Sequence, residues 1–417
     1  MARLEVLVLT LLLYGLGSCR SAAAADPPQQ DADSAPAHDS EFSLVPFVGG
    51  NSDVGFGGGY IASLARLRQD REPYVFRIDT SGSVTFTEGR DGGLRVPYAD
   101  VFLRWKFPHL IPNLLGLELR ASYTRETNLG YFGLGNASSI PAGLERGDNF
   151  FQHSRVHPTL RARFEYHRRP LVFSWGASYT ENWLQVPDGT LLAADLVSRR
   201  AYVRELLGSD RPHGTPTFSL GAAWDTRDDE VAPVRGLNIS EELDLVPGTL
   251  GEAHYRYARW NNAVQVYAPM IARQRRLVFA LRVGSDLLFG NAPFYELPRF
   301  DDSFAIGGSK GVRGVPAQRY YGKIKLLANA ELRSELLSLK LLGVQRRLGL
   351  VAFVDTGRLW ADYTPHPDLD GGGLGLKFGY GGGLRIASGK TFMLRFDLAW
   401  SPEKRGTSGY LLAGHMF

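Results

Sequence analysis

The feature that most constrains the fold is a two-residue alternation of apolar and other side chains, which recurs along nearly the whole chain. In residues 391–400 the apolar set is Phe392, Leu394, Phe396, Leu398 and Trp400. The same spacing recurs in residues 117–123, 171–179, 277–283 and 324–333. Successive side chains of a strand point to opposite faces of a sheet. The pattern therefore predicts many strands, each with one apolar face and one polar face.

A transmembrane barrel explains this pattern better than a soluble β-sandwich, whose strands also alternate. Many segments approach the roughly 9–11 residues with which a tilted strand crosses a bilayer, and charged residues recur opposite the apolar face. After the N-terminus, no apolar run reaches the roughly 18 residues of a membrane helix. Only a closed barrel leaves no strand edge in lipid. We therefore expect an all-β, antiparallel up-and-down transmembrane barrel of about sixteen strands.

The spacing between the predicted strands alternates between short and long. Short connections fall at 168–170 and 387–390, and long ones at 127–156, 185–215 and 289–320. In bacterial barrels the short turns face the periplasm and the long loops face the exterior. With an even number of strands both ends of the barrel lie in the periplasm, and we expect the last strand to end at Phe417.

The N-terminus carries the features of a secretory signal peptide, predicted for residues 1–25. Cleavage after Ala25 fits a small-residue site, while the residues before Cys19 resemble a lipobox, so both cleavage sites remain open. Residues 26–41 are rich in Pro, Gln, Asp, Ser and Ala and predict a disordered periplasmic lead. The barrel domain is expected at 42–417. Because Cys19 is the only cysteine, a mature chain cleaved after Ala25 would have no disulfide.

The sequence offers little support for enzymatic or nucleic-acid-binding functions. The net charge is only +4, without a basic block, so we expect no nucleic-acid partner. The chain contains no H-E-x-x-H, G-x-S-x-G or P-loop motif, and we expect neither catalysis nor a cofactor or metal. Two weaker alternatives are a Ca²⁺ site at Asp368 and Asp370, and a phospholipase using His415, for which no serine partner can be assigned.

A glycine-rich stretch stands out in the second half of the chain. Residues 304–315 contain four glycines and the tripeptide Val312-Arg313-Gly314. Glycines allow the backbone to follow close and unusual paths. The predicted strand count places this stretch in the long loop after the eleventh strand.

Two further segments complete a recognisable pattern. Phe353 and Gly357 flank Asp355 in a Phe-x-Asp-x-Gly strand, and Glu331 lies on the strand between this segment and the loop. With the Val-Arg-Gly loop, these residues resemble the BamA/TamA-type outer-membrane assembly barrels, also called the bacterial surface antigen family. That motif continues with an aromatic residue, whereas this chain has Val315, which weakens the packing contact expected there.

The resemblance extends over nearly the whole predicted barrel. Asp225, Arg227 and Asp228 resemble the periplasmic turn midway through such barrels, and residues 51–55 resemble the tight first hairpin. Aspartates and their neighbours commonly stabilise turns through hydrogen bonds to the backbone. We therefore interpret Asp225, Arg227 and Asp228 as turn-capping residues.

The resemblance also implies a role for the loop arginine. In the family this loop folds back into the barrel, and its arginine meets acidic residues on the inner wall. We expect Arg313 to bridge Glu331 and Asp355, because a guanidinium can donate charge-assisted hydrogen bonds to two carboxylates and a lysine cannot copy that geometry. The alternative is that Arg313 is an ordinary surface arginine.

The family resemblance implies a monomeric barrel of the bacterial cell outer membrane that helps to insert or translocate outer-membrane proteins. Its expected partners are outer-membrane lipid and lipopolysaccharide, client proteins, and a separate periplasmic partner with POTRA domains. Family members usually carry such domains before the barrel, whereas only residues 26–41 separate the predicted signal peptide from the barrel. A passive channel, with selectivity set by lumenal charges, and a surface-binding barrel using loops 127–156 and 185–215 remain alternatives.

Overall fold

The computed structural model describes residues 40–417 apart from short gaps. The gaps are 52–54, 69–73, 89–92, 112–113, 142, 145–148, 230–231, 272–273, 301–302, 342–343, 389–391 and 414. The predicted signal peptide and most of the predicted lead therefore lie outside the described residues.

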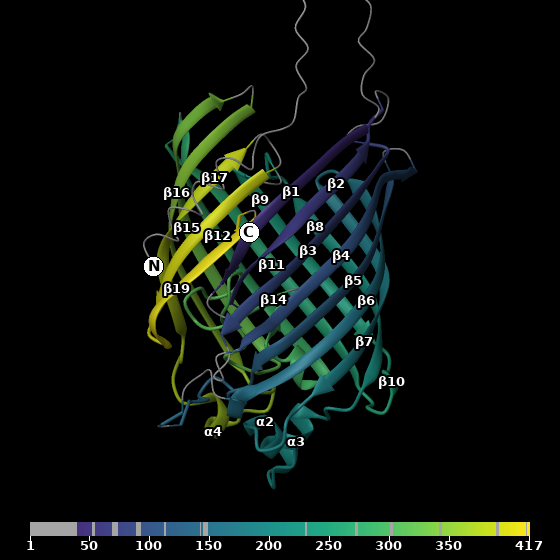
Figure 1. Ribbon diagram of the computed structural model, residues 1–417, viewed down its shortest axis with the longest axis vertical. Coiled ribbons are helices and arrows are strands. Elements are labelled where there is room, and N and C mark those ends of the chain that lie inside the picture. Colours follow the sequence, from purple (N-terminus) through teal and green to yellow (C-terminus); the bar gives the residue numbers. More distant parts are fainter. Residues whose placement is uncertain are drawn as a thin grey trace, which may run out of the picture.

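Sixteen long antiparallel strands form a tilted barrel (Figure 1). The first eight are β1 (Ser40–Asn51), β2 (Gly55–Arg66), β3 (Phe76–Glu88), β4 (Leu94–Ile111), β5 (Leu115–Gly130), β6 (Gln152–Arg168), β7 (Leu171–Gln185) and β8 (His213–Asp225). The second eight are β9 (Gly236–Val246), β11 (Arg256–Ile271), β12 (Gln274–Asn291), β15 (Ile324–Leu341), β16 (Val344–Trp360), β17 (Lys377–Ser388), β18 (Phe392–Ser401) and β19 (Lys404–Ala413). The predicted fold class and strand number are confirmed.

The ring is complete except at the seam between its first and last strands. Each long strand pairs with its neighbour in the chain. β1 forms twelve residue pairs with β2. Between β1 and β19, the described residues form only the pairs Gly50↔Leu411 and Asn51↔Tyr410. Residues 40–49 of β1 thus have no such partner on β19.

The alternation read from the sequence sorts side chains between the two faces of the wall. Trp175 and Phe396 point outward and are 41% and 42% exposed, whereas Asp397, next to Phe396, is fully buried. An apolar outer surface of this kind suits contact with lipid. Among the described residues, no helix is long and apolar enough to cross a membrane.

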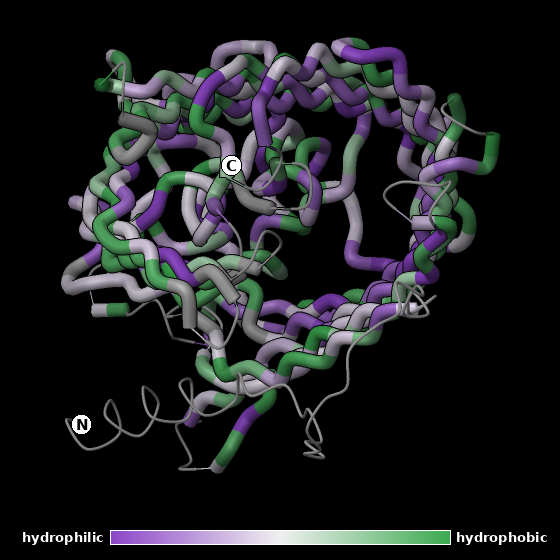
Figure 2. The backbone as a smooth tube through the Cα atoms, turned by 90° about the horizontal axis from the view of Figure 1, so that it is seen from above, coloured by the Kyte–Doolittle hydropathy of each residue, from purple (hydrophilic) through white to green (hydrophobic). Residues whose placement is uncertain are grey.

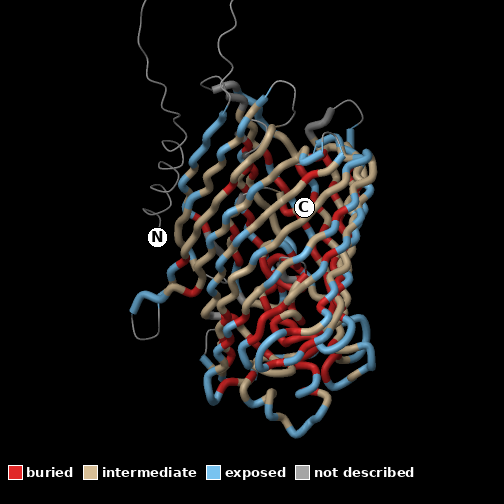
Figure 3. The backbone as a smooth tube through the Cα atoms, turned by 90° about the vertical axis from the view of Figure 1, so that its right-hand side faces the viewer, coloured by how far each residue is buried: buried red, intermediate tan, exposed pale blue. Residues whose placement is uncertain are grey.

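The two ends of the barrel differ in their connections. At one end, called here the short-turn end, most connections are a few residues long. The other, the long-loop end, is rich in buried residues (Figure 3), and the connections that start there contain the helices and the short strands. These elements are η1 (Asn149–Phe151), α2 (Leu191–Leu196), α3 (Ala201–Leu207), β10 (Leu250–Gly251), η2 (Phe294–Glu296), β13 (Arg299–Phe300), β14 (Ser303–Phe304) and α4 (Pro367–Asp370).

An apolar cluster of the long loops covers this end. It joins Tyr131, Leu207, Phe294, Tyr321 and Leu369, all buried, from four different connections. Tyr131 and Tyr321 meet edge to face with ring centroids 5.0 Å apart. The long loops therefore pack together over the barrel mouth.

Two boundaries differ from the sequence-based expectations. β1 begins at Ser40, two residues before the expected start of the barrel. β19 ends at Ala413, so the expectation that the last strand runs to Phe417 is wrong. The chain end turns into the barrel (Figure 2), where the carbonyl oxygen of Phe417 accepts a hydrogen bond from Arg333 Nη2 at 2.9 Å. The inward turn buries Met416 and supplies an acceptor to a buried guanidinium.

Candidate functional site

The connection between β12 and β15, residues 292–323, folds into the lumen and is called here the inserted loop. It follows the eleventh long strand, as the sequence predicted. The loop is held by an apolar cluster that includes Ile306, Val312, Val315 and Tyr320 from the loop and Leu359 from the wall. Burial of these side chains offsets the cost of ordering so long a connection.

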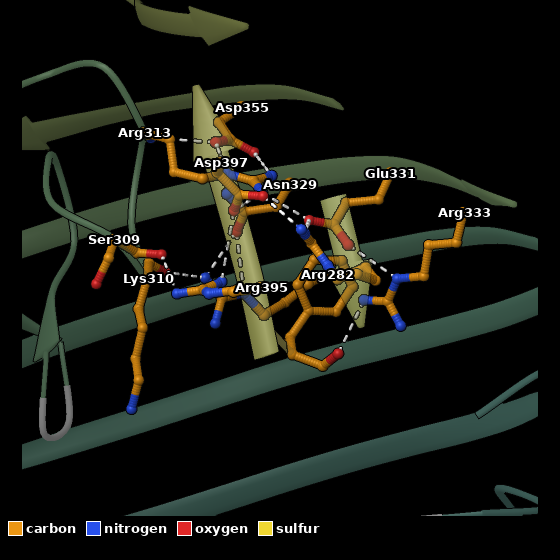
Figure 4. Close-up of polar contacts among 12 residues, drawn as sticks. Arg282, Ser309, Lys310, Arg313, Asn329, Glu331, Arg333, Asp355, Arg395 and Asp397 are labelled. Carbon is orange, nitrogen blue, oxygen red and sulfur yellow. Dashed lines mark hydrogen bonds and ion pairs between the residues drawn. The ribbon is translucent and has the colours of Figure 1, made fainter. Parts of the chain in front are cut away.

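Arg313 lies at the tip of the loop and contacts Asp355 of β16 in a bidentate arrangement (Figure 4). Its Nε donates to Asp355 Oδ2 at 2.7 Å and its Nη2 to Asp355 Oδ1 at 3.0 Å. The backbone N–H of Arg313 also donates to Asp355 Oδ2, at 3.1 Å. Three bonds to one carboxylate fix both the side chain and the backbone of the loop tip.

The same guanidinium contacts two more carboxylates. Nη1 of Arg313 donates to Glu331 Oε1 on β15 at 2.7 Å and to Asp397 Oδ2 on β18 at 3.1 Å. The four side chains of Arg313, Glu331, Asp355 and Asp397 are all fully buried and are called here the Arg313 network. The structure thus brings Arg313 to both expected carboxylates and adds Asp397, which the sequence analysis did not assign to the site.

An aromatic ring packs against the Arg313 guanidinium, which keeps its positive charge. The Arg313 guanidinium lies 3.4 Å from the centroid of the Phe353 ring, a cation–π contact. Burial alone would lower the pKa of Arg313, but the carboxylates of Asp355, Glu331 and Asp397 outweigh burial and raise its pKa above the usual value. Arg313 therefore remains cationic. Removing it would take the ion-pair partner from buried Asp355, whereas Glu331 keeps Arg333 and Asp397 keeps Arg385.

Two wall glycines make room for the loop. A Cβ at Gly379 of β17 would lie 1.7 Å from the carbonyl oxygen of Arg313. A Cβ at Gly357, the last residue of the Phe-x-Asp-x-Gly strand, would lie 2.4 Å from Ile306 Cδ1 and 3.1 Å from Val312 Cγ2. The contact at Gly379 is with backbone, so this position requires glycine for the loop to approach this closely. At Gly357 the nearest atom ends a flexible side chain, although the backbone oxygen of Leu326 also lies only 2.9 Å away.

The other members of the loop motif are also fixed in place. Val312 is fully buried in the apolar cluster, and the N–H of Gly314 donates to the Tyr410 hydroxyl on β19 at 3.0 Å. Val315, which stands where the family motif has an aromatic residue, is fully buried in the same cluster. The loop therefore contacts the last strand as well as β15–β18.

Further arginines hold the loop backbone. Arg282 donates to Asn329 Oδ1 through Nε and Nη2, at 3.0 and 2.7 Å, and also contacts the carbonyl of Lys310. Arg395 donates through Nη2 to the carbonyl of Ser309 at 2.8 Å. These bonds satisfy carbonyl groups that the irregular loop would otherwise leave unpaired.

The predicted turn residues lie at the short-turn end, far along the chain from the loop. Arg227 donates to both carboxylate oxygens of Asp225, and Nη2–Oδ2 is 2.7 Å. Asp228 Oδ1 accepts from the backbone N–H groups of Val234 and Arg235 at 2.9 and 3.2 Å. These contacts are those of a turn-capping set.

The opposite half of the lumen is hollow. A cavity of about 740 Å³ extends along the inner face of the N-terminal strands. It is lined by hydroxyl groups such as those of Thr124, Thr180 and Ser219, with Asp100 and Glu242 among its acidic residues. The inserted loop thus fills one side of the barrel and leaves a polar space on the other.

Asp368 and Asp370, which the sequence analysis considered as a Ca²⁺ site, contact other residues of the protein in the structure. Asp368 pairs with Arg200 at 3.3 Å and accepts a hydrogen bond from Tyr202, while Asp370 Oδ1 accepts from the N–H of Ala361 at 2.8 Å. Within the described part of the chain, no group of three or more His, Cys, Asp or Glu side chains could hold a metal ion.

Comparisons with known proteins agree with this geometry. No curated protein matches the sequence. The fold is similar to BamA from Haemophilus ducreyi lacking POTRA domains 1–3, with 15% identity and a TM-score of 0.57 over 90% of this chain and 70% of that chain. It is also similar to CdiB from Escherichia coli, with 14% identity and a TM-score of 0.55 over 91% of this chain and 64% of that chain. The model of the Omp85 superfamily domain matches residues 123–410, more than half of the sequence, and the chain therefore belongs to the Omp85 superfamily.

Proposed function

We propose that this barrel resides in the bacterial outer membrane and assists the insertion or translocation of outer-membrane proteins. The short-turn end would face the periplasm and the long-loop end the exterior. A separate periplasmic protein would deliver the client to the short-turn end. No nucleotide or cofactor is part of this proposal.

The observation that carries the proposal is the weak seam between β1 and β19. Two pairs of described residues hold it, against twelve between β1 and β2. Residues 40–49 of β1 present backbone groups that β19 does not pair, and an exposed strand edge is a template for an incoming strand. A client strand could add to this edge through main-chain hydrogen bonds.

The outer surface of β1 supports the same use of the seam. Phe42, Leu44 and Val48 are 67%, 57% and 55% exposed, which suits a strand that lies in lipid. Pro46, also on β1, has no N–H to donate and limits how regularly a second strand can pair there. The edge therefore suits transient pairing with a client.

A passive channel is the second candidate, and the 740 Å³ cavity favours it. Its hydroxyl and charged lining would pass water and small polar solutes. The apolar cluster at the long-loop end and the inserted loop oppose it, because both occupy the path between the two ends.

A reversible disulfide across the seam tests the proposal. The variant Gly50→Cys/Leu411→Cys joins residues that are paired in the structure. The matched control Ala62→Cys/Thr80→Cys joins β2 to β3, which are fully paired already. Each barrel is reconstituted into liposomes, and the folding rate of an unfolded client barrel is followed by its gel shift.

We expect the wild type to accelerate client folding relative to empty liposomes. Oxidation should abolish this acceleration in the seam variant, reduction should restore it, and the control should respond to neither. An oxidised seam variant as active as the wild type would contradict opening at the seam. A wild type no faster than empty liposomes would contradict the proposed function itself.

A further inference from the structure

A small cavity lies inside the short-turn end, beneath the Arg313 network. Its volume is about 90 Å³, and its lining includes Val234, Val278, Arg333, Arg385, Met393 and His415. These residues come from the β8–β9 turn, from the wall strands β12, β15, β17 and β18, and from the segment after β19. The cavity therefore lies where distant parts of the chain converge, outside the contacts of Arg313 itself.

Several buried nitrogen atoms around this cavity have no hydrogen-bond partner among the described residues. They are Nη1 of Arg333, Nε and Nη2 of Arg385, and Nδ1 of His415. The side chains of Arg333 and Arg385 are only 7% and 5% exposed. A buried donor without an acceptor destabilises the folded state, and more strongly when it is charged. The site therefore favours an acceptor that the described residues do not supply.

The other nitrogens of the two arginines are already engaged, which fixes their direction. Arg333 donates through Nε to Glu331 at 2.8 Å and through Nη2 to the carbonyl of Phe417 at 2.9 Å. Arg385 donates through Nη1 to Asp397 Oδ1 at 2.5 Å, and its Nη2 lies 3.8 Å from Glu331 Oε1. Both guanidinium groups are thus held rigidly, as a preorganised binding site requires.

The local charge is also unbalanced in favour of an anion. The buried arginines around the network are Arg282, Arg313, Arg333, Arg385 and Arg395. The carboxylates that face them are the buried Glu331, Asp355 and Asp397. Glu335, which also lines the cavity, is paired with Arg347 at 3.9 Å, and Arg333 donates to the terminal oxygen of Phe417. Buried charges are costly unless they are paired, so this region gains from one further negative group.

We propose that the cavity is a binding site for a small oxyanion, a phosphate or carboxylate group held by Arg333, Arg385 and His415. A cavity of about 90 Å³ has room for a group that displaces about three waters, at roughly 30 Å³ each. Arginine donors match the geometry of phosphate and carboxylate oxygens. Burial and the adjacent Arg333 hold the pKa of His415 well below its usual value, so its ring is neutral and can donate one hydrogen bond.

Thermal unfolding of the full-length barrel in detergent, with inorganic phosphate as the probe, tests the site. A ligand that binds only the folded state raises its stability in a saturable manner. We expect phosphate to raise the unfolding temperature more than sodium chloride does at the same ionic strength. An equal effect of the two salts would exclude free phosphate as the ligand, and a lipid titration that also gives no response would overturn the proposal.

Two variants and a control locate the effect. Arg385→Gln removes donors from the cavity, while Ala387→Leu fills it and leaves every arginine in place; Ala387 lines the cavity. Arg163→Gln removes a guanidinium on the opposite wall, where it pairs with Glu242 at 2.9 Å. We expect at least a tenfold loss of apparent phosphate affinity in both cavity variants and none in the control. If Arg385→Gln does not fold, Ala387→Leu decides alone. Wild-type affinity in Ala387→Leu would overturn the proposal.

A second arm of the experiment distinguishes a free solute from a lipid headgroup. The same barrel is titrated with phosphatidylglycerol in the detergent micelles, without inorganic phosphate. A response to inorganic phosphate alone supports a solute, and a response to the lipid that Ala387→Leu abolishes supports a headgroup. A response to neither probe overturns the site. This inference does not depend on the proposed function.

Discussion

The two halves of the barrel wall use the same alternation to build different interiors. The N-terminal strands face a cavity of about 740 Å³ with short hydroxyl side chains. For example, Thr159 and Thr180 lie 3.0 Å apart between their Oγ1 atoms on adjacent strands. The C-terminal strands instead face the inserted loop, with fully buried charges and glycines at the contact points.

This difference shows that polar alternation fixes which face of a strand turns inward, but not what fills the space. Exposed hydroxyl and charged groups on the N-terminal wall can be satisfied by water. On the C-terminal wall the loop excludes water, so each charge needs a partner in the protein. A change of the same chemical kind should therefore cost far more on the C-terminal wall.

The largest contrast is expected from arginine removal. Arg313→Ala leaves three buried carboxylates without their shared cation, and we expect it to destabilise the folded barrel by roughly 3–5 kcal/mol. Arg163→Ala removes a half-buried guanidinium beside the cavity and should cost about 1 kcal/mol or less. Urea unfolding followed by heat-modifiability on gels measures both. Equal losses would break the contrast between the walls.

A smaller contrast is expected within a single strand. In Gly379→Ala the new methyl group clashes with the Arg313 carbonyl, so either the loop or the strand must move. We expect the folded barrel to lose roughly 1–3 kcal/mol of stability. We also expect faster proteolysis of the inserted loop. Gly382→Ala, also on β17, places its methyl 3.4 Å from the Val351 oxygen, an ordinary contact. It should change stability by less than about 0.5 kcal/mol. An unaltered loop in Gly379→Ala would show that the close approach is dispensable.

The smallest effect is expected on the cavity side. Thr180→Val removes the hydroxyl that forms a hydrogen bond with Thr159. Because Thr180 lines the cavity, water can replace that hydrogen bond. We expect a change of at most about 1 kcal/mol in unfolding free energy and no change in loop proteolysis. A larger loss would mean that this wall is as tightly packed as the other.

The faces of the strands were predictable from the sequence, because alternation is a local property of neighbouring residues. The alternation in residues 324–333 predicts one polar face, and the polar residues Lys325, Asn329 and Glu331 of this segment are all buried inside the barrel. The path of the inserted loop depends on distant contacts and cannot be derived from the local pattern. That the loop folds into the barrel was expected only because the Val-Arg-Gly stretch resembles the family motif.

Other features depended on contacts that the sequence pattern does not encode. Asp397 lies opposite the apolar set of residues 391–400, but its contact with Arg313 depends on how deep the loop enters and on the relative register of β16 and β18. The inward turn of Phe417 depends on the position of Arg333 across the lumen. The small number of β1–β19 pairs likewise depends on how the ring closes.

Electrical conductance across planar lipid bilayers shows whether the inserted loop plugs one half of the lumen. The wild type is compared with a barrel that lacks residues 304–318. We predict low, flickering conductance for the wild type and large, steady conductance after the deletion. Large and steady conductance from both barrels would contradict the plugged lumen and favour an open channel.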